Sequence, residues 1–256
     1  MMEKVIIILV DGMRPDAMEA CGHPLLEELR KTTAHCEHTR TVMPSVTLPC
    51  HMSLFHSVPP ERHGTTTNTY MPQVRPVTGL IDAAHDAGCS TAMFYSWEEL
   101  RDIARPGKLD YSVFISLHKF ELVGTRLAKC ALAYCREEKP DLVFLYLGEP
   151  DEVGHKYGWM TKEYLESISL AMGDAKLVMD ALGDEYTVIL TADHGGHDRA
   201  HGTDMPEDMT IPLFIRGKAA EAGKKLEEAS ILDIAPTVAK LLGVRCPKDW
   251  EGKELL

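Results

Sequence analysis

The sequence predicts an α/β fold with a mostly parallel central sheet and helices on both faces. Three observations lead to this prediction. Short apolar runs recur along the chain, helical patterns separate them, and 256 residues suffice for one large α/β unit. The runs hold four to six residues rich in Val, Ile, Leu and aromatics, which suits strands buried on both faces. They cover residues 5–10, 91–95, 111–115, 142–147, 187–190 and 211–215.

Helical patterns fill most of the intervals between these runs. The final one has Asp233 near its start and Gly243 just past its end, which are start and stop signals for a helix. No repeat, linker or change of composition divides the chain, so we expect a single catalytic domain over residues 1–256. The stretch 58–75 reads as a long loop near the site. The expected helices cover residues 24–32, 79–87, 119–139, 162–182 and 232–242.

Composition excludes several classes of protein. The 27 basic and 39 acidic residues give a net charge of −12 without any basic cluster, so no nucleic-acid polymer is expected as a partner. The longest apolar runs, of six residues, are far too short to span a bilayer, and the first residues lead into a strand without a signal peptide. Seven cysteines without a C-x-x-C motif indicate free thiols and a cytoplasmic protein.

Three aspartates follow predicted strands closely. Asp11 comes directly after its strand, Asp151 four residues after LVFLYL, and Asp193 three residues after TVIL. The carboxyl ends of parallel strands share one edge, where open α/β sheets bind ligands. Three carboxylates at one edge would repel one another, and a cation resolves this repulsion. Taken alone, Asp11 with the following glycine is more typical of a turn than of a metal ligand.

Histidines complete a candidate metal site. His155 follows Asp151 by four residues, His194 is adjacent to Asp193, and His197 and His201 lie in a glycine-containing stretch that alone could be a solvated loop. Carboxylates and imidazoles are preferred ligands of Zn²⁺, and Mn²⁺ also suits this set. Six ligands suffice for two divalent ions. The four positive charges of these ions, less the three negative charges of the carboxylates, leave a net charge of +1, which can attract a phosphate. The six are Asp11, Asp151, His155, Asp193, His194 and His201.

A candidate nucleophile lies between the first two of these motifs. Pro49 suits the first turn of a helix, which places Thr47 at the helix N-terminus. Thr is a favoured N-cap, so a purely structural role is one interpretation. The other is catalytic, because a hydroxyl at a helix N-terminus and on a metal can ionise and attack phosphorus. On chemistry alone, Ser45 is an equal candidate.

The motifs together resemble the alkaline phosphatase superfamily, most closely its nucleotide pyrophosphatase/phosphodiesterase (type I phosphodiesterase) branch. The resemblance is carried in family order by VDGMRPD, Pro-x-x-Thr-x-Pro-x-His, ERHGTTTN, EPDEVGHKYG, TADHGGH and RAHGTDMPEDMTIPLFI, and by the closing ILDIAPTVAKLLGV. It implies an alkaline-phosphatase-like fold. Only six residues separate His194 from His201, which leaves no room for the cap domain of larger members.

The resemblance also implies roles for individual residues. One metal would be held by Asp151, His155 and His201, and the other by Asp11, Asp193 and His194. It selects Thr47 as the nucleophile, which also contacts metal. Asn68 would hydrogen-bond a phosphate oxygen. His197 would not bind metal itself but would support the residues that do.

The expected activity is cleavage of phosphodiester or pyrophosphate bonds in a small phosphorylated substrate, with two divalent ions and a phospho-threonine intermediate. The alternative is a phosphomonoesterase or phosphonate hydrolase of the same superfamily. A non-catalytic metal- or anion-binding protein would not need the full ligand set. The absence of C-x-P-S-R argues against a sulfatase. Leu48 stands where relatives often carry an aromatic that holds a nucleobase, so nucleotide preference is not implied. Assembly into a homo-oligomer is left open.

Overall fold

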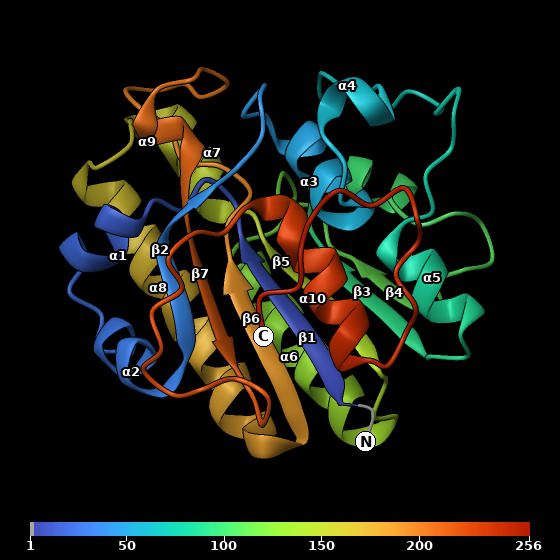
Figure 1. Cartoon of the computed structure of the whole chain (residues 1–256). Helices are drawn as coiled ribbons and strands as arrows, with labels where there is room; N and C mark the ends of the chain where they lie inside the picture. The colour runs from blue at the N-terminus through green and yellow to red at the C-terminus, as the bar shows by residue number, and fades with distance from the viewer. Residues whose placement is uncertain (1–2) are drawn as a thin grey trace.

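The computed structural model describes residues 3–256, and a seven-stranded sheet runs through its centre (Figure 1). The strand order is β2-β7-β6-β1-β5-β3-β4, which places the N-terminal strand in the middle. The strands are β1 (Lys4–Val10), β2 (Ala34–Arg40), β3 (Thr91–Tyr95), β4 (Tyr111–Phe114), β5 (Leu142–Leu147), β6 (Tyr186–Thr191) and β7 (Thr210–Arg216).

The prediction of a mostly parallel sheet is confirmed. β1 pairs in parallel with β5 and β6, and β3 pairs in parallel with β5 and β4. The exception is one side of the sheet, where β7 runs antiparallel to both β6 and β2. β1, β5 and β6 are almost fully buried, as continuous apolar runs require in a sheet covered on both faces.

Two layers of helices cover the sheet (Figure 1). α1, α2, α6, α7 and α8 pack together on one face, while α3, α5 and α10 pack on the other, with α10 lying over β1. The α-helices are α1 (Pro15–Ala20), α2 (Leu25–Thr32), α3 (Thr47–His56), α4 (Pro60–His63), α5 (Leu80–Asp86), α6 (Val123–Glu137), α7 (Glu149–Tyr157), α8 (Lys162–Leu182), α9 (Pro206–Met209) and α10 (Ile234–Leu241). Short 3-10 helices are η1 (Glu98–Asp102), η2 (Gly183–Glu185) and η3 (Ile231–Asp233).

The expected long loop at residues 58–75 contains the short helix α4 and is otherwise irregular. No separate cap domain is found within residues 3–256, in agreement with the short spacing between His194 and His201. In the same range, no helix combines the length and apolar content that crossing a bilayer requires. All seven cysteines are free thiols.

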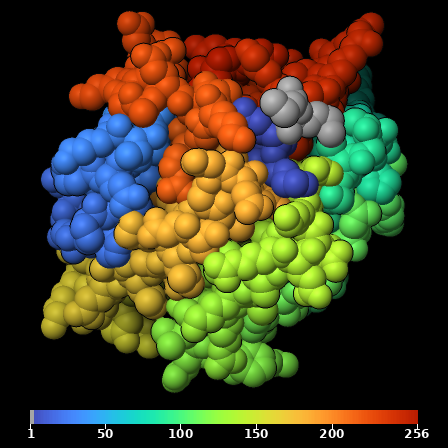
Figure 2. Space-filling view, turned by 90° about the horizontal axis from the view of Figure 1, so that it is seen from below, coloured from blue at the N-terminus to red at the C-terminus, as the bar shows by residue number. Residues whose placement is uncertain are grey.

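The two ends of the sheet differ in what covers them. Viewed from below, the end at which β1 begins is closed by α6, in lime, and by the connection from α8 to β6, in gold (Figure 2). At the opposite end, the strands run into α3, α7 and the loop before α9 (Figure 1). The residues singled out from the sequence lie at this second end.

Candidate active site

The three predicted aspartates meet at one edge of the sheet because β5, β1 and β6 are adjacent and parallel. Asp11 is the first residue after β1, and its backbone N–H donates to the carbonyl of Leu147 at the end of β5 at 3.0 Å. Asp193 follows β6 by two residues. Asp151 lies in the first turn of α7, so that His155 falls one turn later on the same helix.

One group of candidate ligands is buried. Asp11, Asp193 and His194 are each at most 1% exposed. The His194 Nε2 atom lies 3.3 Å from Asp11 Oδ1 and 3.4 Å from Asp193 Oδ2. Each carboxylate therefore directs one oxygen at the same point.

The other oxygen of each buried carboxylate is held by the protein. Asp193 Oδ1 accepts the backbone N–H groups of Gly12 at 3.2 Å and His194 at 3.0 Å. Asp11 Oδ2 accepts the phenol O–H of Tyr146. Asp11 Oδ1 and Asp193 Oδ2 have no hydrogen-bond partner within the described residues although both are buried, which demands an explanation.

The second group is Asp151, His155 and His201, and it opens toward solvent. His155 Nε2 lies 3.5 Å from Asp151 Oδ2, His201 Nε2 lies 3.6 Å from Asp151 Oδ1, and the two Nε2 atoms are 3.2 Å apart. The His155 side chain is 45% exposed, whereas that of Asp151 is 13% exposed. A substrate can approach this group directly.

Backbone carbonyls fix the tautomer of all three histidines. A carbonyl oxygen only accepts, so the Nδ1 atoms must donate: His194 to Gly195 at 2.8 Å, His155 to Arg199 at 3.0 Å and His201 to Ser45 at 2.8 Å. The Nε2 lone pairs are therefore the ones that face the carboxylates, which is the arrangement of metal-binding histidines.

Both groups fit a tetrahedral divalent cation. A metal with ligands at about 2.1 Å needs ligand atoms about 3.4 Å apart, and the separations above are close to this value. Burial raises the pKa of Asp193 to about 8 and, together with the negative charges of Asp193 and Asp151, raises that of Asp11. Burial lowers the pKa of His194 to about 3 and that of His201 to about 4, so both rings are neutral and able to accept a cation. A cation would stabilise the ionised carboxylates and supply the partners that the buried oxygens lack.

The predicted nucleophile lies beside the buried group. Thr47 is the first residue of α3, and its Oγ1 is 3.1 Å from His194 Nε2. It makes no capping hydrogen bond, so the structural interpretation of this threonine as an N-cap is wrong. The amide oxygen of Asn68 instead accepts the Leu48 N–H near the start of the helix, at 3.0 Å. The rival Ser45 donates its hydroxyl to the Thr203 carbonyl at 2.7 Å and does not line the pocket.

A pocket of about 160 Å³ connects these residues to solvent. Thr47, Asn68 and candidate ligands from both groups line its inner part. Its remaining wall comes from residues that the sequence analysis did not assign, namely Trp97, Leu117, Tyr146, Gly148 and Glu152. Tyr146 carried a faint signal, since it is the one hydroxyl-bearing side chain in the run LVFLYL.

His197 lies outside both ligand groups. Its Nδ1 contacts Asp208 Oδ1 at 2.7 Å, and this carboxylate raises the pKa of His197. Asp208 also accepts the backbone N–H and the hydroxyl of Thr203 at 2.9 and 2.7 Å. These contacts brace the loop that carries His201, so His197 touches no ligand directly but stabilises the segment that holds one.

Tight packing around Trp159 holds the loops of the site in place. Its indole N–H donates to the carbonyl of Gly12 at 3.0 Å, and its ring lies 5.3 Å from that of His155. Gly12 adopts a φ of +67°, which only glycine tolerates readily. A Cβ atom on Gly196 would lie 2.2 Å from the Trp159 ring, so this position also excludes a side chain.

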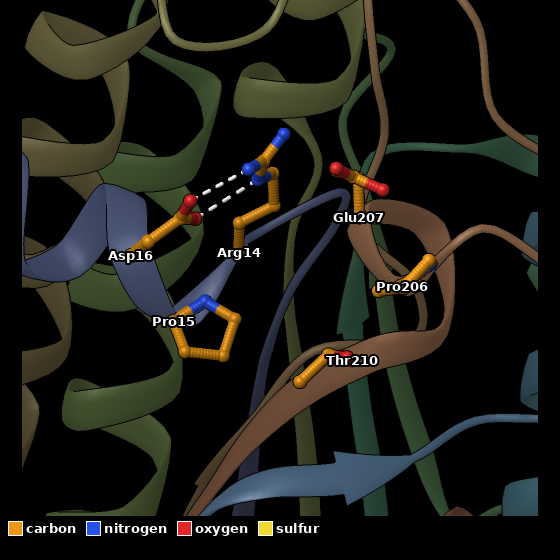
Figure 3. A pocket seen from close by; sticks show the side chains of 6 residues that line it. All are labelled: Arg14, Pro15, Asp16, Pro206, Glu207 and Thr210. Carbon is orange, nitrogen blue, oxygen red and sulfur yellow. Dashed lines mark hydrogen bonds and ion pairs between the residues drawn. The ribbon is translucent and has the colours of Figure 1, made fainter.

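A separate cavity of about 280 Å³ lies between the segment entering α1 and the segment of α9 and β7 (Figure 3). Arg14 and Glu207 point into it, but the Arg14 guanidinium is paired with Asp16, with an Nη2–Oδ2 distance of 2.6 Å. None of the candidate ligands lines this cavity, so the chemistry belongs to the pocket at Thr47.

Comparison with known families agrees with this geometry. The family described as type I phosphodiesterase/nucleotide pyrophosphatase matches residues 5–99 and 82–205, which is more than half of the chain. The chain belongs to this family. This confirms the predicted resemblance to the nucleotide pyrophosphatase/phosphodiesterase branch of the alkaline phosphatase superfamily. A second description, sulfatase, matches residues 175–244.

Relatives of this family member share part of their length with it. The chain is 25% identical over 220 residues to bis(5'-adenosyl)-triphosphatase of Mus musculus and 24% identical over 220 residues to ectonucleotide pyrophosphatase/phosphodiesterase family member 1 of Homo sapiens. These alignments cover 75% and 74% of this chain but 47% and 23% of the relatives. A 2,3-bisphosphoglycerate-independent phosphoglycerate mutase of Clostridium acetobutylicum is 33% identical over 126 residues, covering 46% of this chain and 24% of the mutase.

Solved structures show the same fold. Human ectonucleotide pyrophosphatase/phosphodiesterase 5 superposes with a TM-score of 0.83 at 14% identity, covering 98% of this chain and 97% of that one. The murine protein, in complex with AMP, gives 0.82 at 15% identity with 97% of each chain covered. A 2-O GAG sulfatase gives 0.77 at 14% identity, covering 100% of this chain and 73% of that one. At these identities the likeness shows the fold alone, and the alkaline-phosphatase-like prediction is confirmed.

Proposed function

We propose that this family member is a binuclear metal-dependent phosphodiesterase or nucleotide pyrophosphatase in which Thr47 is the nucleophile. The observation that supports it is the pair of three-ligand groups, which direct unpartnered carboxylate oxygens and Nε2 lone pairs at two points beside one hydroxyl. One divalent cation, Zn²⁺ or Mn²⁺, would be held by Asp11, Asp193 and His194. The other would be held by Asp151, His155 and His201.

Bound at these positions, the cations would favour ionisation of the Thr47 hydroxyl and stabilise charge on the attacking and leaving oxygens. Thr47 Oγ1 attacks phosphorus, the bond to the leaving oxygen breaks, and the leaving group departs with a proton from water. A water molecule then attacks the phospho-threonine and restores the hydroxyl. Because Leu48 N–H is bound to the Asn68 amide oxygen, the Asn68 NH₂ group is left to donate to a non-bridging phosphate oxygen.

The size of the pocket supports the proposal of a small substrate. The pocket volume of about 160 Å³ holds a phosphate and a modest ester group rather than a polymer. This is consistent with the net charge of −12, which disfavours a polyanionic partner.

Substitution of Thr47 tests the mechanism. After reconstitution with Zn²⁺ or Mn²⁺, we expect Thr47→Ala to lose turnover of bis-(p-nitrophenyl) phosphate by orders of magnitude while keeping its fold and metal content. Thr47→Ser keeps the hydroxyl and should retain part of the activity. Ser45→Ala removes the hydroxyl that donates to Thr203 and should cost about 1 kcal/mol of stability but little turnover.

Circular dichroism and metal analysis of every variant separate unfolding from loss of chemistry. Near-normal turnover by a folded, metal-loaded Thr47→Ala protein would refute the covalent mechanism. A stoichiometry of one metal or less per chain at saturation would refute the binuclear centre.

A further inference from the structure

The lining of the active-site pocket includes a negative charge that the predicted chemistry does not use. Glu152 follows the candidate ligand Asp151 in α7 and lines the same pocket. Its side chain is exposed and forms no ion pair or hydrogen bond within residues 3–256. A carboxylate left free beside a site for an anion opposes binding, so its presence has a consequence for the substrate.

No lysine or arginine among the described residues lines this pocket to offset Glu152. The basic residues nearest to the ligands in sequence, Lys156 and Arg199, are exposed and do not belong to the lining. The Lys156 ammonium lies 4.9 Å from the centre of the Tyr157 ring, on the outside of α7. The positive charge available to a substrate therefore comes from the bound cations and from the start of α3.

A charge sum indicates which phosphate this pocket would favour. With the Thr47 hydroxyl still protonated, two divalent cations and the carboxylates of Asp11, Asp151 and Asp193 would leave +1, and Glu152 would reduce the sum to zero. Ionisation of Thr47 would lower it further. A phosphodiester carries one negative charge, whereas a phosphomonoester carries nearly two at neutral pH because its second pKa is about 6. The second negative charge of a phosphomonoester finds no lysine or arginine in the lining to pair with, and Glu152 repels it.

We propose that Glu152 is a specificity-determining residue that makes the site accept singly charged phosphodiesters and reject doubly charged phosphomonoesters. This inference rests on the proposed function and goes beyond it, since it assigns the choice between the two substrate classes to one side chain. The uncharged Trp97 and Leu117 line the same pocket and offer a wall for the second ester group of a diester. That group is what a monoester lacks.

The test is a charge series at position 152 in the full-length, metal-loaded protein. The variants are Glu152→Gln, Glu152→Lys and a matched control, Glu163→Lys. Glu163 is exposed at the start of α8 and lies outside the pocket, so the control makes the same change of net charge elsewhere. The kcat/KM values for bis-(p-nitrophenyl) phosphate and p-nitrophenyl phosphate give the diester-to-monoester ratio for each protein.

We expect the ratio to fall about tenfold in Glu152→Gln, which removes one unit charge, and about a hundredfold in Glu152→Lys, which reverses it. A tenfold change corresponds to about 1.4 kcal/mol. The shift should come mainly from faster monoester turnover, should shrink at high ionic strength, and should be less than twofold in the control.

A binding experiment separates failure of this inference from failure of the proposed function. Titration calorimetry of the metal-loaded proteins compares inorganic phosphate with dimethyl phosphate, which carries a single charge. Tighter binding of inorganic phosphate, but not of dimethyl phosphate, in Glu152→Lys supports the inference even if neither nitrophenyl ester is hydrolysed. An unchanged preference in both Glu152 variants, or an equal shift in Glu163→Lys, would overturn it.

Discussion

Without a cation at the proposed site, the stability of this protein should depend on the ionisation of Asp193. Burial raises the pKa of this carboxyl to about 8 from its ordinary value of 3.8. At pH 6.8 the folded, metal-free protein keeps a proton on Asp193, whereas the unfolded chain has lost it. As the pH rises through 8, the folded protein must ionise a buried carboxyl beside Asp151 without a cation. The free energy of unfolding therefore falls with rising pH.

The size of this effect follows from the two pKa values. With a folded pKa of about 8, proton binding by Asp193 adds about 1.7 kcal/mol to the free energy of unfolding at pH 6.8 and about 0.2 kcal/mol at pH 8.5. The expected loss is thus about 1.5 kcal/mol. Buried histidines act in the opposite direction below about pH 7, because burial lowers the pKa of His194 to about 3 and that of His201 to about 4. A direct pH scan would mix the two effects.

Comparison with Asp193→Asn cancels the histidines, since they titrate in both proteins, and reports on the Asp193 carboxyl together with its effect on the neighbouring Asp11. Urea unfolding of the metal-free proteins should show the Asn variant gaining about 1.5 kcal/mol on the wild type between pH 6.8 and 8.5. With metal bound the order should reverse, because the wild-type carboxylate is then a ligand. A stability difference that stays constant over this pH range in the metal-free proteins would refute the reasoning.

Further substitutions test the supports of the site. Tyr146→Phe removes the phenol that donates to Asp11 Oδ2, and we expect metal affinity to fall 10- to 100-fold at one of two sites, measured by competition with a chelator. Metal affinities in Tyr146→Phe that equal those of the wild type at both sites would contradict this. Gly196→Ala would place a Cβ atom 2.2 Å from the Trp159 ring and should destabilise the fold by about 2 kcal/mol or more in thermal denaturation. Gly173→Ala serves as the control, because its Cβ atom would meet only His23 Nε2, at 3.9 Å, and neither glycine has a positive φ.

The sequence predicted every strand of the sheet except β2, at one edge. All six strands expected from apolar runs are present. Five of them are largely buried, and strands buried on both faces must be apolar along their whole length, whereas β4, at the opposite edge, is apolar in sequence but largely exposed. β2 was missed. Its sequence, AHCEHTR, is largely polar, which an edge strand tolerates because it pairs on one side only. The five expected helices are also present, each within a few residues of its bounds. The helices α1 and α7 were missed, because their sequences, PDAMEA and EPDEVGHKY, hold too few apolar residues for a helical period to be recognised.

For the site, sequence reasoning named the side chains that the sheet edge brings together but not those that hold them. Asp and His after strands form a readable pattern, since strand order places them at one edge. The contact of Tyr146 with Asp11 depends on the register between β5 and β1, in which Tyr146 is paired with Leu9. The position of Glu152 in the pocket depends on the direction of α7. Both are properties of packing between elements, which the local sequence does not determine.

The central place of β1 has a consequence for how the chain is made. Its partners begin at residues 142 and 186, so both neighbours of the first strand are synthesised long after it. While the chain grows from its N-terminus, the apolar segment VIIILV is without its strand partners until more than half of the 256 residues have followed. A nascent chain of this kind exposes an aggregation-prone strand, and chaperones that bind short apolar segments are expected to meet it at this stage.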